Sequence, residues 1–144
     1  MIEILVSSVI PAKVDRVWSV VRDFNAMPAW HPAIAQSRIE GGAASDTIGC
    51  VRNFSLKDGN KIREKLLCLS DLDHSFSYSI LTADIPLENY RAELALFPVT
   101  DGDQTFGIWT ARFTCPKGME TDLEKTVGQG VFQTGFDALK SRFA

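Results

Sequence analysis

Two charged residues, Arg52 and Glu64, occupy positions where the sequence pattern predicts buried apolar groups. Side chains alternate between the two faces of a strand. Read as a strand, residues 50–56 present on one face Cys50, Arg52, Phe54 and Leu56. Residues 61–68 present in the same way Ile62, Glu64, Leu66 and Cys68. Burial of an unpaired charge costs several kcal/mol, so an inward arginine and glutamate predict an ion pair, a polar cavity, or both.

The turn between these two strands tests this interpretation, because its length decides which residues face each other. If Asp58-Gly59 were a two-residue loop, Arg52 would face Lys65, a like-charge pair, and the apolar faces would disagree. If residues 57–59 form a three-residue loop with a left-handed glycine, Arg52 faces Glu64. Only this second register places both apolar faces on one side, and we therefore predict it.

An inward Arg–Glu pair with Tyr90 nearby could bind or transform a small molecule. Arg52 would hold an anionic or carbonyl oxygen through its planar guanidinium. Glu64 could act as a general acid or base if burial raises its pKa, and Tyr90 could donate a hydrogen bond to developing negative charge. The alternative is a structural salt bridge that orients the floor of a cavity, with Tyr90 hydrogen-bonded to it.

The surrounding pattern predicts the elements that position these residues. Apolar positions at helical spacing predict a helix after Pro11, and Pro28 and Pro32 limit the next segment to a short helical turn. The remaining alternation and turn residues predict strands at 2–10, 35–40, 50–56, 61–68, 74–83, 89–97 and 105–115. We therefore expect one α+β domain over residues 1–144, with a curved antiparallel sheet of about seven strands wrapped on a long C-terminal helix.

That last helix, predicted over residues 119–143, is unusual because three glycines, Gly128, Gly130 and Gly135, lie inside it. Each costs about 1 kcal/mol relative to alanine in a helix interior. Small residues on the face toward the sheet allow either very close packing or space for a ligand, and the sequence favours neither alternative. A curved sheet wrapped around a single helix is typical of folds with an interior cavity.

Composition bounds the function. The chain has 45% hydrophobic and 23% charged residues, as in an ordinary soluble protein. A net charge of −3 and the lack of an evident basic face argue against a nucleic-acid partner. No apolar run approaches the roughly 20 residues of a membrane span, and neither a basic n-region nor a cleavage site of a secretory signal is visible.

The cysteines and histidines predict no metal site. Cys50, Cys68 and Cys115 are odd in number and lack ligand-like spacing, and the histidines are His31 and His74. Free thiols in a reducing cytoplasm are the expected state of the cysteines. We expect no metal and no cofactor, and a monomer or weak homodimer.

Several short motifs, in this order and spacing, carry a resemblance to a known superfamily. They are Ile10-Pro11-Ala12, Val17-Trp18, Trp30-His31-Pro32, Gly49-Cys50-Val51-Arg52, Arg63-Glu64-Lys65-Leu66, Tyr78-Ser79-Ile80 and Pro86-Leu87-Glu88-Asn89-Tyr90. Over essentially its whole length the chain resembles the SRPBCC superfamily of START-like, birch-pollen-allergen-like helix-grip proteins, and within it the polyketide cyclase/dehydrase-like group. The resemblance implies a cavity for a hydrophobic or amphipathic small molecule, and in some members cyclisation, dehydration or isomerisation.

A narrower similarity concerns the three polar residues. Arg52, Glu64 and Tyr90 are similar to the cavity Arg, Glu and Tyr of the onion lachrymatory-factor synthase branch, which rearranges a sulfenic acid. The Arg-to-Glu hairpin is shorter here, so that substrate is not transferred to this chain. Besides this trio, the expected ligand contacts are Trp30, His31, Phe54, Tyr78, Trp109, Gly128, Val131 and Phe132.

The expected cavity has its mouth near residues 27–30 and 84–87, with His31 at the rim, and His74 is expected to be solvated. Three functions remain open: a carrier or sensor of a hydrophobic small molecule, a cofactor-independent cyclase, dehydratase or isomerase, and a protein-binding domain. An exposed apolar patch would favour the third. Outward apolar residues that could mark a dimer contact are Leu67, Leu69, Phe106 and Ile108.

Overall fold

Seven strands form one antiparallel sheet in the computed structural model, which describes residues 1–144. The strands are β1 (Ile2–Ile10), β2 (Ile34–Ile39), β3 (Val51–Leu56), β4 (Lys61–Ser70), β5 (Ser75–Ala83), β6 (Glu88–Val99) and β7 (Gln104–Thr114). Their spatial order is β1-β7-β6-β5-β4-β3-β2. β2 through β7 are therefore joined as consecutive hairpins, and β1 closes the sheet beside β7 at one edge. The predicted helix-grip α+β architecture is confirmed.

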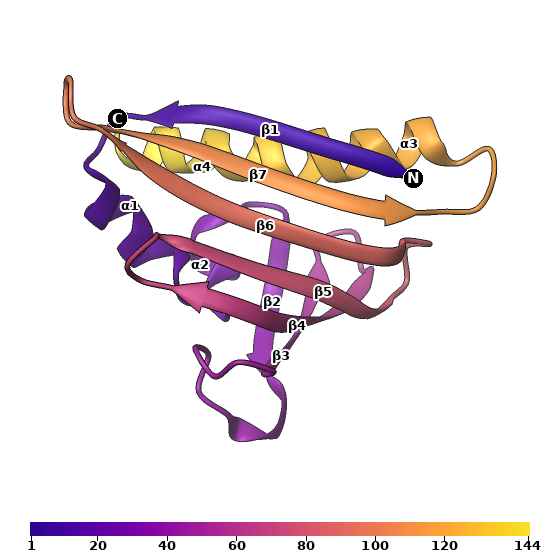
Figure 1. Cartoon of the computed structure of the whole chain (residues 1–144). Coiled ribbons are helices and arrows are strands. Elements are labelled where there is room, and N and C mark those ends of the chain that lie inside the picture. The colour runs from indigo at the N-terminus through magenta and orange to yellow at the C-terminus, as the bar shows by residue number, and fades with distance from the viewer.

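Two short helices and one long one complete the fold. α1 (Val14–Val21) and α2 (Met27–Trp30) follow β1, and a 3₁₀ turn, η1 (Glu40–Gly42), follows β2. The C-terminal helix consists of three contiguous parts: α3 (Glu120–Lys125), the π-helical η2 (Thr126–Gln133) and α4 (Thr134–Arg142). It lies across one face of the sheet, behind β1 and β7 in Figure 1.

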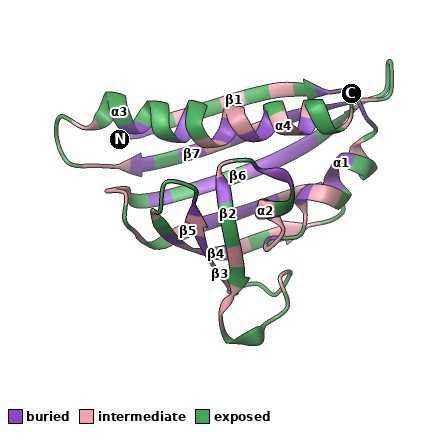
Figure 2. Cartoon of the chain, turned by 180° about the vertical axis from the view of Figure 1, so that it is seen from behind, coloured by how far each residue is buried: buried purple, intermediate pink, exposed green.

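The sheet is strongly twisted: in Figure 1, β2 runs steeply across the direction of β1. Its concave face holds the C-terminal helix, and purple buried segments in Figure 2 line the space between the two. Aromatic side chains fill much of that space. The Trp109 ring stacks on Phe132 with centroids 4.5 Å apart, and Phe136 meets Trp109 edge-on at 5.9 Å. The long helix is thus fixed to the sheet by large buried rings.

The predicted register of the β3–β4 hairpin is confirmed. Arg52 pairs with Glu64 and Phe54 with Ile62. The loop has three residues, 57–59, since the Leu56 N–H donates to the Asn60 carbonyl at 2.8 Å. Gly59 has φ +95, the left-handed conformation that the loop requires.

One part of β4 departs from prediction. A register shift between Leu66 and Cys68 reverses the alternation, so that Cys68 is exposed and Leu69 packs against the core. The prediction that Cys68 faces inward and Leu69 outward was therefore wrong. A β-bulge adds one residue to one strand, and a simple two-residue period cannot reveal where it does so.

Of the three glycines in the C-terminal helix, Gly135 serves close packing. A Cβ atom at Gly135 would lie 2.9 Å from the Trp109 ring, a distance that real Cβ atoms essentially never show, and 3.0 Å from the His31 ring. A Cβ at Gly128 would meet Ile4 at 3.5 Å, an ordinary contact. Gly135 therefore allows the helix to lie close to Trp109 on β7 and to His31.

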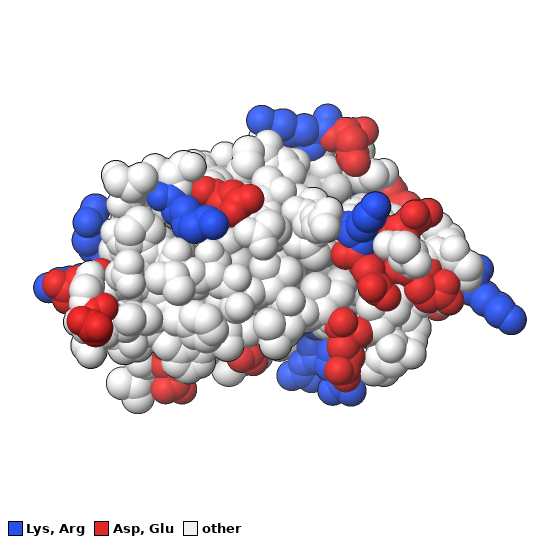
Figure 3. Space-filling model, turned by 90° about the horizontal axis from the view of Figure 1, so that it is seen from above, with Lys and Arg blue, Asp and Glu red and all other residues white.

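Charged side chains lie mainly around the margins of the surface formed by β1 and the C-terminal helix. Figure 3 shows a broad uncharged area in the middle of this surface.

None of the helices combines the length and the hydropathy needed to cross a bilayer. All three cysteines are free thiols.

Candidate functional site

The centre of the candidate site is a buried ion pair between β3 and β4. Arg52 and Glu64 are only 1% and 5% exposed. Arg52 Nε donates to Glu64 Oε1 at 2.8 Å, and Arg52 Nη2 lies 2.7 Å from the same oxygen. The inward ion pair predicted from strand alternation is therefore present.

The rest of the Arg52 guanidinium is held by the protein as well. Its Nη1 donates to the backbone carbonyl of Phe24 at 3.0 Å. The guanidinium carbon lies 3.9 Å from the centroid of the Phe24 ring and 4.8 Å from that of Tyr78. Cation–π contact is most favourable when the cation is desolvated. Arg52 is thus fixed in position by β4, by aromatic rings and by the backbone that follows α1.

Burial controls the ionisation of this cluster. Desolvation raises the pKa of Glu64, although the charge of Arg52 and its hydrogen bond act in the opposite direction. Desolvation also raises the pKa of Tyr78 and, together with the neighbouring Tyr78 and Glu64, that of Tyr90. Both phenols therefore remain protonated at neutral pH, while Glu64 is easier to protonate than an exposed glutamate.

A small apolar cavity adjoins the pair. Its free volume is about 30 Å³, and 13 of its 16 lining residues are hydrophobic. The lining comes from the concave sheet face, α2, the β5–β6 loop and η2: Met27, Ile34, Arg52, Phe54, Leu56, Ile62, Glu64, Tyr78, Ile80, Ile85, Leu87, Tyr90, Trp109, Thr126, Val127 and Val131. A space of this size holds one or two water molecules. The cavity is much smaller than the sequence analysis implied.

The structure brings most of the expected site residues to this cavity. The residues on its lining that we expected are Arg52, Phe54, Glu64, Tyr78, Tyr90, Trp109 and Val131. Trp30, Phe132 and Gly128 lie outside the lining. Trp30 and Phe132 pack against Trp109 at centroid distances of 6.2 and 4.5 Å, and Gly128 lies against β1. These three are core positions.

His31 is not a rim residue, contrary to prediction. It is 1% exposed. Its Nδ1 accepts the Ala33 N–H at 3.2 Å, so Nε2 carries the proton and donates to the Val131 carbonyl at 2.7 Å. Burial lowers its pKa, which keeps the ring neutral. His31 therefore joins the segment after α2 to the π-helical part of the C-terminal helix.

His74 and Trp30 differ from expectation in smaller ways. His74 is half-buried, lying edge-on to Trp18 with its Nε2 3.3 Å from an Asp15 oxygen. The indole N–H of Trp30 is buried without a hydrogen-bond acceptor. Such orphaned donors are rare in folded proteins.

The π-helical segment η2 supplies the helix side of the cavity through Thr126, Val127 and Val131. Its backbone is π-helical: the Thr134 N–H donates to the Gln129 carbonyl, five residues earlier, and the Thr134 hydroxyl donates to the same oxygen at 2.8 Å. π-turns inside α-helices are rare and often occur at functional sites. Thr126 and Val127 were missed by sequence reasoning. The four-residue spacing of Val127 and Val131 was the signal that could have identified them.

The β5–β6 loop closes the other end of the cavity with Ile85 and Leu87. Its Asp84 accepts the Lys61 N–H at 2.8 Å, which ties the loop to the start of β4. Met27 of α2 also lines the cavity. The expected mouth near residues 27–30 and 84–87 thus corresponds to segments that border the cavity.

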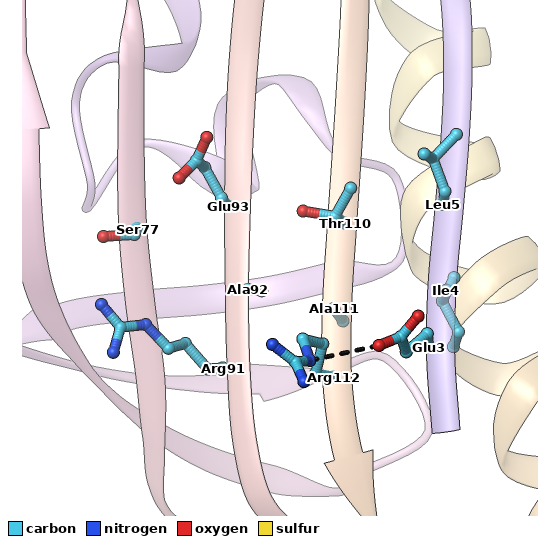
Figure 4. A pocket seen from close by; sticks show the side chains of 10 residues that line it. All are labelled: Glu3, Ile4, Leu5, Ser77, Arg91, Ala92, Glu93, Thr110, Ala111 and Arg112. Atoms are coloured by element: carbon cyan, nitrogen blue, oxygen red, sulfur yellow. Dashed lines mark ion pairs between the residues drawn. The ribbon is translucent and has the colours of Figure 1, made fainter. Parts of the chain in front are cut away.

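A larger hollow of about 530 Å³ lies on the opposite, convex face of the sheet. Figure 4 shows Arg91 and Arg112 beside each other on neighbouring strands, with Arg112 paired to Glu3 at 3.4 Å. Glu3 and Arg112 are about two-thirds exposed. Exposed pairs of this kind contribute little to stability. Because this furrow is open and its charged residues are exposed, we take the inner cavity as the candidate site.

No cluster of three or more His, Cys, Asp or Glu side chains converges as a metal site would require.

Apolar residues form a row on the outer face of the sheet: Phe97 on β6, Phe106 on β7 and Val9 on β1 are paired in register. The Phe97 and Phe106 rings lie 6.4 Å apart. Of the outward positions expected for a dimer contact, Phe106 belongs to this row and Ile108 to the one beside it.

Curated relatives match only part of the chain. Two abscisic acid receptors of Arabidopsis thaliana, PYL7 and PYL10, are 33% identical over 92 residues and 31% identical over 99 residues. These matches cover 62% and 67% of this chain, and 42% and 53% of the receptors. The chain thus spans about half the length of the curated relatives it matches.

Solved structures match the whole chain. XoxI of Bacillus cereus is 26% identical with a TM-score of 0.89, over 99% of this chain and 96% of XoxI. A protein of Thermobifida fusca is 30% identical with a TM-score of 0.88, over 99% and 93% of the two chains. A START superfamily protein of Mycobacterium smegmatis shares the fold at 14% identity, with a TM-score of 0.78 over 98% and 96%.

The family comparison agrees with the architecture. The model of the family described as polyketide cyclase / dehydrase and lipid transport matches residues 1–144. The helix-grip sheet and the shared fold of the START superfamily protein are consistent with that match. The chain belongs to this family, and with it to the SRPBCC superfamily.

Proposed function

We propose that the protein binds a hydrophobic or amphipathic small molecule between the concave sheet face and the C-terminal helix, with the polar end of the ligand at Arg52, Glu64 and Tyr90. The observation that carries the proposal is the buried ion pair on the lining of an otherwise apolar cavity. Binding sites for small molecules are mostly apolar, with a few polar groups that fix orientation. The family description and the similarity to abscisic acid receptors support this class of function.

Binding requires the cavity to expand. Sites for molecules of drug size have volumes of roughly 300–1,000 Å³, whereas the free volume here is about 30 Å³. The segments that could move without breaking sheet pairing are the β5–β6 loop and η2. A ligand of this kind would displace Ile85, Leu87 and Val131 from their contacts with the sheet.

A variant that fills the cavity tests this proposal. Val131→Phe adds a ring where η2 borders the cavity, and we expect it to weaken binding of the neutral fluorophore N-phenylnaphthylamine at least tenfold. Val9→Phe adds the same ring on the outer face of β1, where Val9 is 46% exposed, and should leave binding unchanged. Equal affinities in the two variants, with both folded by circular dichroism, would contradict the proposal.

Co-purified molecules offer a second test. Native mass spectrometry of freshly prepared protein should detect a small molecule that Val131→Phe loses and Val9→Phe retains. A ligand that binds only the native state also raises the melting temperature.

Three free thiols fit a reducing compartment, and we propose the cytoplasm as the location.

Catalysis is the second candidate function, and the raised pKa of Glu64 favours it. General acids and bases work best when their pKa lies near the operating pH. If Glu64 transfers protons, Glu64→Gln should lower turnover by roughly 10²–10⁴-fold with binding nearly intact. Tyr90→Phe should give a smaller loss, because it removes one hydrogen bond and little packing. Equal turnover in wild type and Glu64→Gln would exclude this role.

A further inference from the structure

We infer that the polar end of the ligand is a neutral hydrogen-bond donor, an alcohol or phenol hydroxyl, received by Glu64 Oε2, and that the site rejects carboxylates. This inference rests on the proposed function and assigns its ligand class. It reverses the expectation from sequence, in which Arg52 was the group that would hold an anionic oxygen. Three features of the buried cluster carry it.

First, Arg52 is already bound on two sides. Its Nε donates to Glu64 Oε1 at 2.8 Å, its Nη2 lies 2.7 Å from the same oxygen, and its Nη1 donates to the Phe24 carbonyl at 3.0 Å. The Phe24 and Tyr78 rings lie against the guanidinium at 3.9 and 4.8 Å. An incoming carboxylate that took the place of Glu64 or of the Phe24 carbonyl at Arg52 would leave a buried acceptor unsatisfied.

Second, one oxygen of Glu64 remains without a partner. Both contacts of Arg52 go to Oε1, and no side chain or backbone N–H of the protein hydrogen-bonds to Oε2. An ionised carboxylate only accepts hydrogen bonds. Because Glu64 lines the cavity, the group that completes its hydrogen bonding must be a hydrogen-bond donor.

Third, the cavity offers no free positive charge. Arg52 and Glu64 are the charged residues of its lining and they neutralise each other. A ligand carboxylate would add an uncompensated negative charge to an apolar, desolvated space, which costs several kcal/mol. A ligand ammonium would add a positive charge beside Arg52 at a similar cost. A hydroxyl satisfies Oε2 and leaves the cavity neutral.

The rest of the lining fixes the body of the ligand. Thirteen of the sixteen lining residues are hydrophobic, among them Ile62, Ile80 and Val127. Alkyl or aryl groups fit such walls, since burial of apolar surface is the favourable term there. The ligand class is therefore a lipophilic alcohol or an alkyl- or aryl-substituted phenol.

Three ligands that differ in the head group alone test the inference. Para-hexylphenol donates a hydrogen bond, para-hexylanisole accepts but does not donate, and para-hexylbenzoate is anionic at about pH 8. Each competes with N-phenylnaphthylamine for the wild-type protein. We expect the phenol to bind at least about tenfold more tightly than the anisole and the benzoate, because a hydrogen bond to a charged acceptor is worth more than a tenfold difference in affinity.

Glu64→Gln replaces the free acceptor oxygen, Oε2, with a hydrogen-bond donor. Its amide oxygen can accept from Arg52, which leaves the NH₂ group to face the ligand. We expect the preference for phenol over anisole to disappear in this variant. Glu40→Gln removes a carboxylate that is paired with an arginine on the outer face, and it should keep the wild-type ranking.

The outcomes separate the two proposals. Benzoate binding as tight as phenol binding in wild type, or an unchanged ranking in Glu64→Gln, would overturn the ligand class while leaving fluorophore binding and its loss in Val131→Phe in place. If the fluorophore itself does not bind, or binds equally to Val131→Phe, the proposed function fails and the ligand class falls with it. The wild-type ranking decides the inference even if Glu64→Gln does not fold.

Discussion

Arg63 and Glu64 are neighbours on β4, yet their side chains enter two ion pairs with opposite electrostatic outcomes. On the convex face, Arg63 Nε and Nη2 hold the two oxygens of Glu40 at 2.7 and 2.8 Å. On the concave face, Arg52 holds Glu64 at similar distances. Hydrogen bonds from Arg63 lower the pKa of Glu40 to about 2, whereas burial raises that of Glu64.

Exposure to solvent, and not the arginine, therefore decides whether the pKa of the carboxylate falls or rises. A partly exposed carboxylate keeps much of its hydration and gains the arginine bonds in addition, so its charged form is favoured. A buried carboxylate loses its hydration, and the bonds of one arginine do not fully restore it. The outer pair thus links η1 to β4 at the surface. The inner pair is a polar group on the wall of an apolar cavity, and its carboxylate is easier to protonate.

Removing the carboxylate from the inner pair should cause the largest effect. Glu64→Leu leaves the Arg52 cation buried without a counter-charge, and arginine cannot lose its proton in a protein. We expect the free energy of unfolding in urea to fall by about 3–5 kcal/mol. Glu40→Leu is the matched change on the outer face and should lower it far less. Comparable losses in the two variants would show that the pairs do not differ as described.

Removing the arginine should give a loss that depends on pH. Arg52→Met leaves Glu64 buried, but a carboxyl group can take up a proton. We expect a loss of about 3–5 kcal/mol at pH 8, and a clearly smaller one at pH 5, where protonation removes the unpaired charge. Urea unfolding at both pH values measures this. A loss independent of pH would mean that Glu64 does not protonate in the variant.

The two glutamates of the wild type should contribute opposite slopes to stability against pH. The pKa of Glu40 falls from 4.5 unfolded to about 2 folded, so its contribution is present above about pH 4.5 and is lost as pH falls toward 2. The pKa of Glu64 rises above 4.5 on folding, so the folded state binds more protons and stability falls as pH increases from about 4.5.

Unfolding free energies against pH for Glu40→Gln and Glu64→Gln isolate the two contributions. Glu40→Gln should flatten the acid side of the profile below about pH 4.5, and Glu64→Gln should remove the decline above it. If both substitutions changed the same side of the profile, the two carboxylates would share one kind of environment.

Replacing the inner pair entirely should cost the least. The double variant Arg52→Met/Glu64→Leu keeps similar volume and leaves no buried charge, and such replacements are often neutral or stabilising. We expect a free energy of unfolding within about 1–2 kcal/mol of wild type, despite the large losses of the single variants. Additive losses would instead show that the pair itself stabilises the fold. A near-neutral result would show that the ion pair contributes little net stability to the fold.

Strand alternation and turn length were sufficient to predict the inner pair. Arg52 and Glu64 lie in phase with apolar neighbours, and only a three-residue loop aligns the two faces. The structure confirms this register together with the curved sheet and the C-terminal helix. These features depend on short-range rules of period and turn geometry, which are written in neighbouring residues.

The bulge in β4 and the place of His31 could not be predicted in this way. Cys68 faces outward because one extra residue near Leu67 reverses the alternation. His31 is buried because the carbonyl of Val131, one hundred residues later, accepts its N–H. Nothing in the composition of residues 27–34 indicates that partner.

The size of the cavity was likewise decided by packing between distant segments. Gly135 permits the helix to approach Trp109 and His31 closely, and Phe132 stacks on Trp109, so the space that the glycines suggested is filled. Which Glu64 oxygen stays free also depends on where Phe24 and Tyr78 hold Arg52. Local sequence thus specifies which residues turn inward, because period and turn length act over a few residues. Only the tertiary structure decides what those residues meet, because burial, hydrogen bonding and pKa depend on groups brought together from across the whole chain.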